Sequence, residues 1–232
     1  MKFTKNTRRA TFLSRPNRFK ALVELEGETL EVHVPNTGRI REILLPGSTV
    51  ILREEANPLR KTPYSLIAAY KGEALINIDS QIPNKVVEEA LLEGRVEALK
   101  GYRRVHREKF YGNSRFDFLL ENDEGKKYYL EVKGVTLEHE GLASFPDAKT
   151  ERGAKHVGEL MEAKAEGHGA GILFVLQMEN MKGFTPAYAL DPYFSETLEK
   201  AHAQGVEIFA YGCRVTESSL DLQEEVPVHF RG

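Results

Sequence analysis

The stretch SRFDFLLENDEGKKYYLEVKGVTL, residues 114–137, is typical of a β-hairpin, with two apolar strands around the turn-forming residues NDEG. Charged residues interrupt both strands: Asp117 lies in the first, and Glu131 and Lys133 lie in the second. Because side chains alternate along a strand, Glu131 and Lys133 share one face. These charged groups, among residues that otherwise favour burial, make the hairpin a candidate functional site.

Whether Asp117 meets Glu131 depends on the register of the hairpin. If residues 121 and 127 are the last paired residues, Asp117 lies directly opposite Glu131. If residue 121 pairs with residue 126, Asp117 falls on the wrong face, unless a β-bulge corrects the register. The sequence permits the carboxylate pair and leaves both registers open.

The chemistry of such a pair favours a divalent cation. Two carboxylates about 5 Å apart at Cβ repel each other and are best neutralised by a cation. Oxygen ligands without a nearby histidine or cysteine favour Mg²⁺ or Mn²⁺ over zinc. Lys133 could orient the attacking water in metal-assisted phosphodiester hydrolysis. The competing interpretation is a cross-strand salt bridge on a solvated face, since the E-x-K spacing recurs at residues 124–126 and 162–164.

Length and composition restrict the class of protein. The 232 residues suffice for one large domain or two small ones. No apolar run approaches the roughly 20 residues that span a bilayer, and the basic N-terminus lacks the apolar region of a secretory signal. Cys213 is the only cysteine, which excludes an intrachain disulfide and fits a reducing compartment. We therefore expect a cytoplasmic protein without membrane segments.

The distribution of charge favours a polyanionic partner, although the net charge is −3. Only basic charges precede Glu24, and a second basic cluster, residues 100–109, is interleaved with aromatic residues. Either cluster alone can be a solvated face balanced by acidic neighbours. Two clusters that flank the hairpin favour nucleic acid.

The N-terminal part is predicted to be β-rich. Short strand-like runs separated by Gly, Pro and Asn favour a small β-barrel, with an OB-fold as one candidate. The turn PNTGR, residues 35–39, could hold a phosphate through backbone N–H groups and the Arg39 guanidinium. We place a domain boundary near Pro83, which gives domains of residues 1–82 and 83–232.

The second domain is predicted to be mixed α/β. Asn84 and Thr150 are candidate N-caps of helices that end at Gly94 and Gly167. A third helix, residues 191–205, separates two short apolar runs that are typical of buried strands. Helical crossovers between these strands imply that they are parallel.

Several segments resemble one known family. SRFDFLL, EVKGVTL and especially FPDAKTERGAKHVGEL are similar to the sugar fermentation stimulation protein A family, and HVPNTGR, LLPGSTV and IPNKVVEEAL match its N-terminal and middle segments. The similarity covers essentially the whole chain. The resemblance implies an OB-like domain followed by an α/β domain of the PD-(D/E)XK nuclease-like fold. It also implies DNA binding and a role in regulating sugar (maltose) metabolism.

The resemblance also assigns residues to the nuclease pattern. The Asp of the second core strand corresponds to Asp117, and the E-x-K of the third corresponds to Glu131 and Lys133. The acidic residue of the first core helix would be Glu89, next to Glu88. Asp117, Glu131 and Glu89 are thus implied as ligands of Mg²⁺ or Mn²⁺, with Lys133 as the water-positioning residue.

Basic residues are the candidate DNA contacts. Arg152, Lys155 and His156 lie within one turn at the start of a predicted helix, where backbone N–H groups favour anions. Asp147 and Thr150 are expected to cap this helix. The remaining predicted contacts are Arg8, Arg9, Arg15, Arg18, Arg39 and Arg115.

Two functional hypotheses follow. The first is a cytoplasmic DNA-binding protein with a Mg²⁺-dependent nuclease-type site. The alternative is a DNA-binding transcriptional regulator of sugar fermentation genes whose nuclease-like site is catalytically silent. The sequence leaves the oligomeric state open, with a homodimer as one option.

Overall fold

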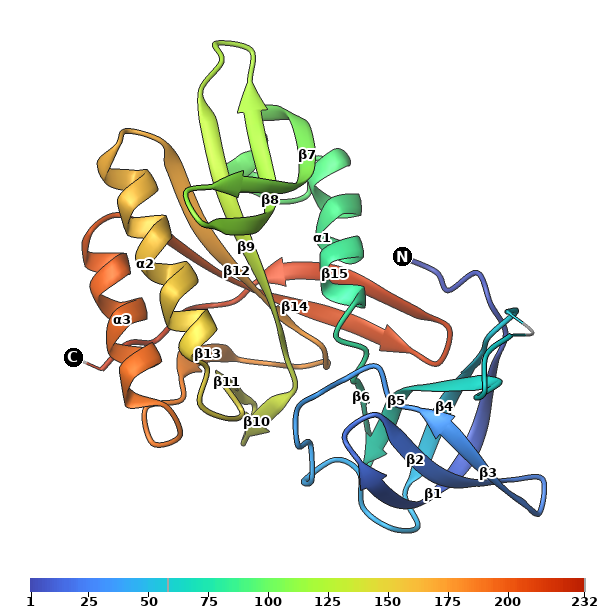
Figure 1. The fold of residues 1–232 in the computed structure, drawn as a ribbon. Helices are drawn as coiled ribbons and strands as arrows, with labels where there is room; N and C mark the ends of the chain where they lie inside the picture. Colours follow the sequence, from blue (N-terminus) through green and yellow to red (C-terminus); the bar gives the residue numbers. More distant parts are fainter. Residues whose placement is uncertain (58, 232) are drawn as a thin grey trace.

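The computed structural model describes residues 1–57 and 59–231. It has two sheet-based parts, joined where β6 leads into α1 (Figure 1). Six strands build the N-terminal part: β1 (Thr7–Asn17), β2 (Lys20–Leu25), β3 (Glu28–His33), β4 (Thr49–Glu54), β5 (Tyr64–Lys71) and β6 (Ala74–Asn77). Their order is β3-β2-β1-β4-β5-β6, and one pairing between β3 and β5 closes the first five strands into a ring.

The C-terminal part surrounds a six-stranded mixed sheet of order β15-β14-β12-β9-β8-β7. Strands β9, β12 and β14 are parallel, and the outer pairs are antiparallel. The strands are β7 (Tyr102–Tyr111), β8 (Ser114–Asn122), β9 (Lys127–Val135), β12 (Gly169–Leu176), β14 (Glu207–Thr216) and β15 (Ser219–Glu225). The parallel order of the later strands confirms the prediction made from the helical crossovers.

Helices cover both faces of this sheet. Helices α2 (Glu151–Ala165) and α3 (Pro192–Ala203) lie together on one face, and α1 (Ile82–Leu92) lies on the other (Figure 1). A 3₁₀ turn, η1 (Glu97–Leu99), follows α1. A small sheet of β10 (Leu137–His139), β11 (Leu142–Phe145) and β13 (Gly183–Pro186) lies beside the start of α2. The mixed α/β fold, with a small ring of strands before an α/β sheet, is therefore the predicted one.

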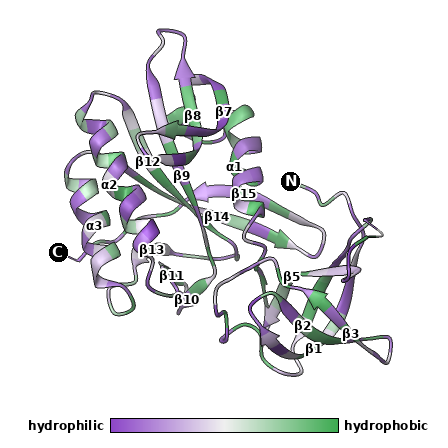
Figure 2. Ribbon diagram, viewed as in Figure 1, coloured by the Kyte–Doolittle hydropathy of each residue, from purple (hydrophilic) through white to green (hydrophobic). Residues whose placement is uncertain are grey.

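Strand β12 forms the centre of the core. Its residues from Ile172 to Leu176 are 0% exposed, because the helices cover both of its faces. Each such side chain contributes about 1.5–3 kcal/mol on burial. Figure 2 shows where the apolar residues lie: they concentrate on strands such as β12, while α2 and α3 alternate between hydrophilic and apolar residues. This pattern confirms that the apolar run before residues 191–205 is a buried strand, which ends at Leu176.

The start of α1 differs from the prediction. Gln81 is the N-cap residue and Pro83 occupies the first turn, so Asn84 lies inside the helix and does not cap it. Proline suits this position because the N–H that it lacks would have no helical partner. The predicted boundary between residues 82 and 83 falls in this first turn and stays a prediction.

The first residues of the chain reach across to the C-terminal part. The Phe3 N–H donates to the Ser218 carbonyl at 2.8 Å, and the Met1 amino group donates to the Leu220 carbonyl at 2.9 Å. The N-terminus thus joins the start of β15 to the ring, because Phe3 also packs against Ile51, Ile67 and Ala68 of β4 and β5. Within the described residues, no helix is long and apolar enough to cross a membrane.

Candidate functional site

The loop between β8 and β9 fixes the register of the hairpin. Glu121 pairs with Lys127, and Asn122 Oδ1 accepts two backbone N–H bonds within the loop, at 3.1 and 2.8 Å. This is the register in which Asp117 lies opposite Glu131. The first of the two alternatives left open by the sequence is therefore the observed one.

The ladder between β8 and β9 ends just before the two carboxylates. Its last pair is Phe118 with Leu130. Phe118 packs on the α1 side of the sheet, whereas Phe116 packs on the α2 side. The alternation expected for β8 therefore breaks at Asp117, because this part of the strand is no longer held by β9. At the break, the Asp117 carboxylate itself accepts the Val132 N–H at 2.8 Å.

Asp117 is held from the α1 side. Its Oδ1 accepts a hydrogen bond from Asn84 Nδ2 at 2.6 Å. Burial raises the pKa of the Asp117 carboxyl, and the negative charge of Glu131 raises it further, against the opposing effects of Val132, Lys133 and Asn84. The charge of Glu131 is thus one of the influences on the Asp117 carboxyl.

Glu131 is held from the α2 side. Its side chain is 3% exposed, and its Oε1 lies 2.6 Å from Lys133 Nζ and 2.6 Å from His156 Nδ1. Burial alone would raise the pKa of Glu131, but the contacts with His156 and Lys133 outweigh it and lower the pKa. Its other oxygen, Oε2, is buried and has no hydrogen-bond partner among the described residues.

The position of His156 differs from the prediction. His156 was expected to contact DNA, but it is 4% exposed and lies against Glu131. Arg152 Nε approaches His156 Nε2 at 3.4 Å, which is consistent with Nδ1 donating to Glu131. His156 therefore orients the buried carboxylate. The contact joins residues 25 positions apart in the sequence, so a local pattern could not show it.

The predicted third ligand is not brought to this site. Glu89 Oε2 lies 2.8 Å from the Met1 amino group and 3.7 Å from Arg95, and Glu88 pairs with Arg107 at 3.2 Å. The helix instead directs Asn84, near its N-terminus, to Asp117. In the described part of the chain, no three Asp, Glu, His or Cys side chains are grouped to hold a metal ion.

The predicted DNA-contacting residues fall into groups. Three arginines pair with acids: Arg8 with Glu26, Arg9 with Glu217 at 2.6 Å and Arg115 with Glu108 at 3.3 Å. Lys155, exposed on α2, lies 3.7 Å from Glu159. The remaining arginines form no ion pair with an acid within residues 1–57 and 59–231, and these are Arg15, Arg18, Arg39 and Arg152.

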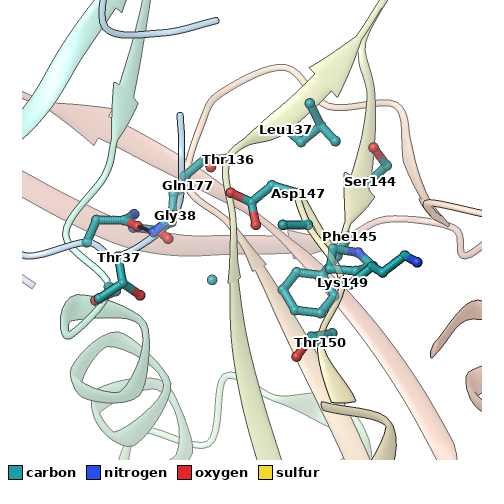
Figure 3. Close-up of a pocket in the computed structure, with 15 residues that line it drawn as sticks. Thr37, Gly38, Thr136, Leu137, Ser144, Phe145, Asp147, Lys149, Thr150 and Gln177 are labelled. Carbon is teal, nitrogen blue, oxygen red and sulfur yellow. Dashed lines mark hydrogen bonds between the residues drawn. The ribbon is translucent and has the colours of Figure 1, made fainter. Parts of the chain in front are cut away.

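A cavity of about 360 Å³ separates the ring from the start of α2. Thr37 and Gly38 line one side, and the segment from Phe145 to Thr150 lines the other (Figure 3). Gly134, the residue after Lys133, lines the cavity too, whereas Asp117, Glu131, Lys133 and His156 are not among its lining residues.

Two residues of this cavity were expected to be helix caps. Thr150 caps α2 as predicted, because its Oγ1 accepts the Gly153 N–H at 3.1 Å. Asp147 does not cap: its carboxylate lies against Gly38, so that a Cβ on Gly38 would be 2.7 Å from Asp147 Oδ2. Figure 3 shows this carboxylate inside the cavity and the Lys149 ammonium pointing away from it.

Gln177, which follows β12, was missed by the sequence reasoning. It is 2% exposed, lines the cavity, and donates from Nε2 to Asn77 Oδ1 at 2.8 Å. It thereby connects the C-terminal sheet to the end of β6. A glutamine after an apolar run carries no signal that would distinguish this bridging role from solvent exposure.

Two family models match the chain. The model described as "SfsA N-terminal OB domain" matches residues 13–78, and the one described as "Sugar fermentation stimulation protein RE domain" matches residues 81–219. The chain belongs to the sugar fermentation stimulation protein family. The resemblance found in the sequence and the OB-like nature of the N-terminal part are thereby confirmed.

Relatives in this family match along their whole length. The sugar fermentation stimulation protein homolog of Clostridium tetani is 60% identical over 97% of both chains, and that of Clostridium acetobutylicum is 60% identical over 98% of this chain and 99% of its own. The solved structure of Pyrococcus furiosus SfsA in complex with Ca²⁺ has a TM-score of 0.90 at 30% identity, covering 99% of this chain and 100% of that one.

Proposed function

We propose that this member of the family binds DNA and hydrolyses phosphodiester bonds with a divalent cation held by Asp117 and Glu131. The observation that carries the proposal is the buried Glu131 Oε2, which has no partner among the described residues. It belongs to a carboxylate whose charge raises the pKa of the neighbouring Asp117. A buried polar atom without a partner costs about 1–3 kcal/mol, and a bound cation would remove that cost.

The donor atoms fit a hard divalent cation. Asp117 and Glu131 offer carboxylate oxygens, which Mg²⁺, Mn²⁺ and Ca²⁺ prefer. A Ca²⁺ complex of the P. furiosus relative supports a divalent cation in this family, and we propose Mg²⁺ or Mn²⁺ for hydrolysis. When bound, such a cation polarises a phosphoryl oxygen and lowers the pKa of its water.

The chain's own groups would orient the reactants. Lys133 Nζ lies 2.6 Å from Glu131 Oε1, and its side chain is 20% exposed, so its ammonium can contact an incoming water or phosphate. A fixed positive charge there stabilises negative charge that develops on the phosphorus substituents. His156 holds Glu131 in place, because its Nδ1 lies 2.6 Å from the same carboxylate.

Phosphate contacts would come from the exposed side of α2. Arg152 and Lys155 lie in its first turns, where the helix N-terminus favours anions. We expect binding that weakens steeply with salt, because backbone contacts release counterions. We also propose a cytoplasmic location, since Cys213 is the only cysteine, and a division into residues 1–82 for backbone binding and residues 83–232 for hydrolysis.

The alternative function is a DNA-binding regulator with a catalytically silent site. It is favoured by one observation: His156 and Lys133 both lie 2.6 Å from Glu131 Oε1, and these contacts stabilise the buried carboxylate without a cation. In that case binding would survive chelation, no substrate would be cleaved, and affinity would differ between operator and random DNA.

The decisive experiment is cleavage of a panel of single- and double-stranded DNA and RNA in Mg²⁺ and Mn²⁺. Glu131→Gln and Lys133→Gln are compared with matched controls, Glu138→Gln and Lys71→Gln, since this lysine–glutamate pair has the same 2.6 Å separation in another place. We expect the two site variants to lose about 10²–10³-fold in rate and to keep binding, and the controls to keep both. Binding without cleavage on every substrate would reject hydrolysis in favour of the regulator.

A further inference from the structure

Four arginines line one cavity at the edge of the ring. The cavity has a volume of about 500 Å³ and lies between the β1–β2 turn and the loop that follows β3. Its basic side chains are Arg15, Arg18, Arg39 and Arg41, and none of its lining residues is acidic. Within the described residues, none of these four arginines forms an ion pair with a carboxylate. The other two arginines of β1, Arg8 and Arg9, both do.

Arg15 builds the wall of this cavity. Its guanidinium donates to the backbone carbonyls of Gly38, Arg39, Arg18 and Asn36 at 2.7–2.9 Å. These bonds tie the β1–β2 turn to the loop of residues 36–39. Its Nε is buried and has no partner among the described residues. Carbonyl dipoles solvate the cation but leave its net charge in place, so the cavity is positive and fits an anion.

The cavity continues towards the carboxylate site. Thr37, Gly38 and Ala148 line both this cavity and the cavity of about 360 Å³ that Figure 3 shows. At its other end, that second cavity is lined by Gly134, the neighbour of Lys133. Asp147 is the only acidic residue that lines it, so the positive charge is concentrated at the arginine end of the path.

We infer that the arginine cavity anchors the sugar-phosphate backbone of a single-stranded nucleic acid, which then runs past residues 37–38 towards Lys133. This inference rests on the proposed function and specifies its substrate class. The two cavities have volumes of about 360 and 500 Å³, within the range of small-ligand sites of about 300–1,000 Å³, so each has room for a nucleotide unit of one strand. Because the anchor contacts only the sugar-phosphate backbone, it binds strands of any base sequence.

An exposed aromatic ring next to the cavity supports a single strand. Phe19 is 52% exposed, and the Arg18 guanidinium lies 5.8 Å from the centre of its ring. A cationic groove beside an accessible aromatic face is the combination that binds unpaired bases, because every base can stack on it.

The test measures binding to the full-length protein without metal. A fluorescein-labelled single-stranded DNA and its duplex are titrated in EDTA over a salt series, and fluorescence anisotropy is recorded. The variant Arg18→Gln/Arg39→Gln/Arg41→Gln keeps Arg15, which holds the loop. The control Arg60→Gln/Arg95→Gln/Lys126→Gln removes the same charge from basic residues that pair with acids. Urea unfolding verifies that both triple variants are folded. If the cavity variant does not fold, the single variant Arg41→Gln is used in its place.

We expect the wild type to prefer the single strand. Loss of three phosphate contacts should reduce the slope of log K against log salt by about 2, at about 0.7 per contact for single strands. Equal slopes in the two triple variants, a preference for the duplex, or no binding at all would overturn the anchor. A cleavage assay separates the anchor from the proposed function. Binding that depends on the arginines, without any cleavage, supports the anchor and rejects hydrolysis. Cleavage that depends on Lys133, with binding that does not depend on the arginines, rejects the anchor alone.

Discussion

Replacing His156 by alanine should destabilise the protein by about 3 kcal/mol. His156 Nδ1 lies 2.6 Å from Glu131 Oε1, and both side chains are buried. A hydrogen bond to a charged group contributes about 1.5–3 kcal/mol. The imidazole also packs edge-on against the Phe116 ring, at 5.9 Å between ring centres, and such an aromatic contact adds about 0.5–1.5 kcal/mol. Lys133 remains on the carboxylate, which limits the loss.

The loss is measured by urea unfolding at pH 7. With a urea dependence of about 3 kcal/mol per molar, the midpoint of the His156→Ala variant should fall by about 1 M. His139→Ala is the matched control, because His139 is exposed on β10 and surface substitutions usually stay within about 0.5 kcal/mol.

A double-variant cycle tests the cause. Once Glu131→Gln has removed the buried charge, the loss of His156 should cost less, with a coupling of about 1–3 kcal/mol between the two positions. If His156→Ala unfolds at the same urea concentration as His139→Ala, or if the two costs simply add, then His156 does not hold the carboxylate and the argument for its role is wrong.

Three other outcomes follow from the geometry. Asp117→Asn should raise the urea midpoint at pH 7, because burial and then the Glu131 charge raise the pKa of Asp117 and disfavour its ionisation in the folded state; the gain should vanish below pH 3.8, where the carboxyl is protonated in both states. Burial raises the pKa of the Cys213 thiol to about 12, so a thiol reagent at pH 8 should modify the native protein far more slowly than the urea-unfolded chain. Gly38→Ala should destabilise by about 1–3 kcal/mol, because its Cβ would lie 2.7 Å from Asp147 Oδ2 and 2.9 Å from Asn36 Oδ1. An added Asp147→Ala should restore part of the lost thermal stability, because it removes the first of these two contacts.

The elements that the sequence predicted well carry local signals. Thr150 caps α2 through its own side chain, and the unbroken apolar run of β12 needs no partner to be recognised as buried. In both cases a few adjacent residues determine the conformation. The hairpin loop is local too, but the sequence left two registers open, and only the structure selects the one that pairs Glu121 with Lys127.

The parts that were missed depend on distant contacts. Strand β7 is rich in Arg, His and Lys because it is exposed at the edge of the sheet, so no apolar pattern marks it as a strand. Helix α1 begins at Ile82, so Asn84 lies in its first turn and does not cap it. The packing of the helix against the sheet places Asn84 against Asp117 and Glu89 against Met1. Neither the pairing of β7 nor this packing can be derived from local composition.

Calorimetric titration with Mn²⁺ tests most directly whether the carboxylate pair holds a divalent cation. The wild type is compared with Asp117→Asn and Glu131→Gln, and Glu138→Gln serves as the control because its carboxylate pairs with Lys71 at 2.6 Å in another place. We predict one saturable site in the wild type and the control, weakened at least about tenfold in both site variants, since each loses a charged oxygen ligand. Equal affinity in all four proteins, or no binding by the wild type, would contradict the account.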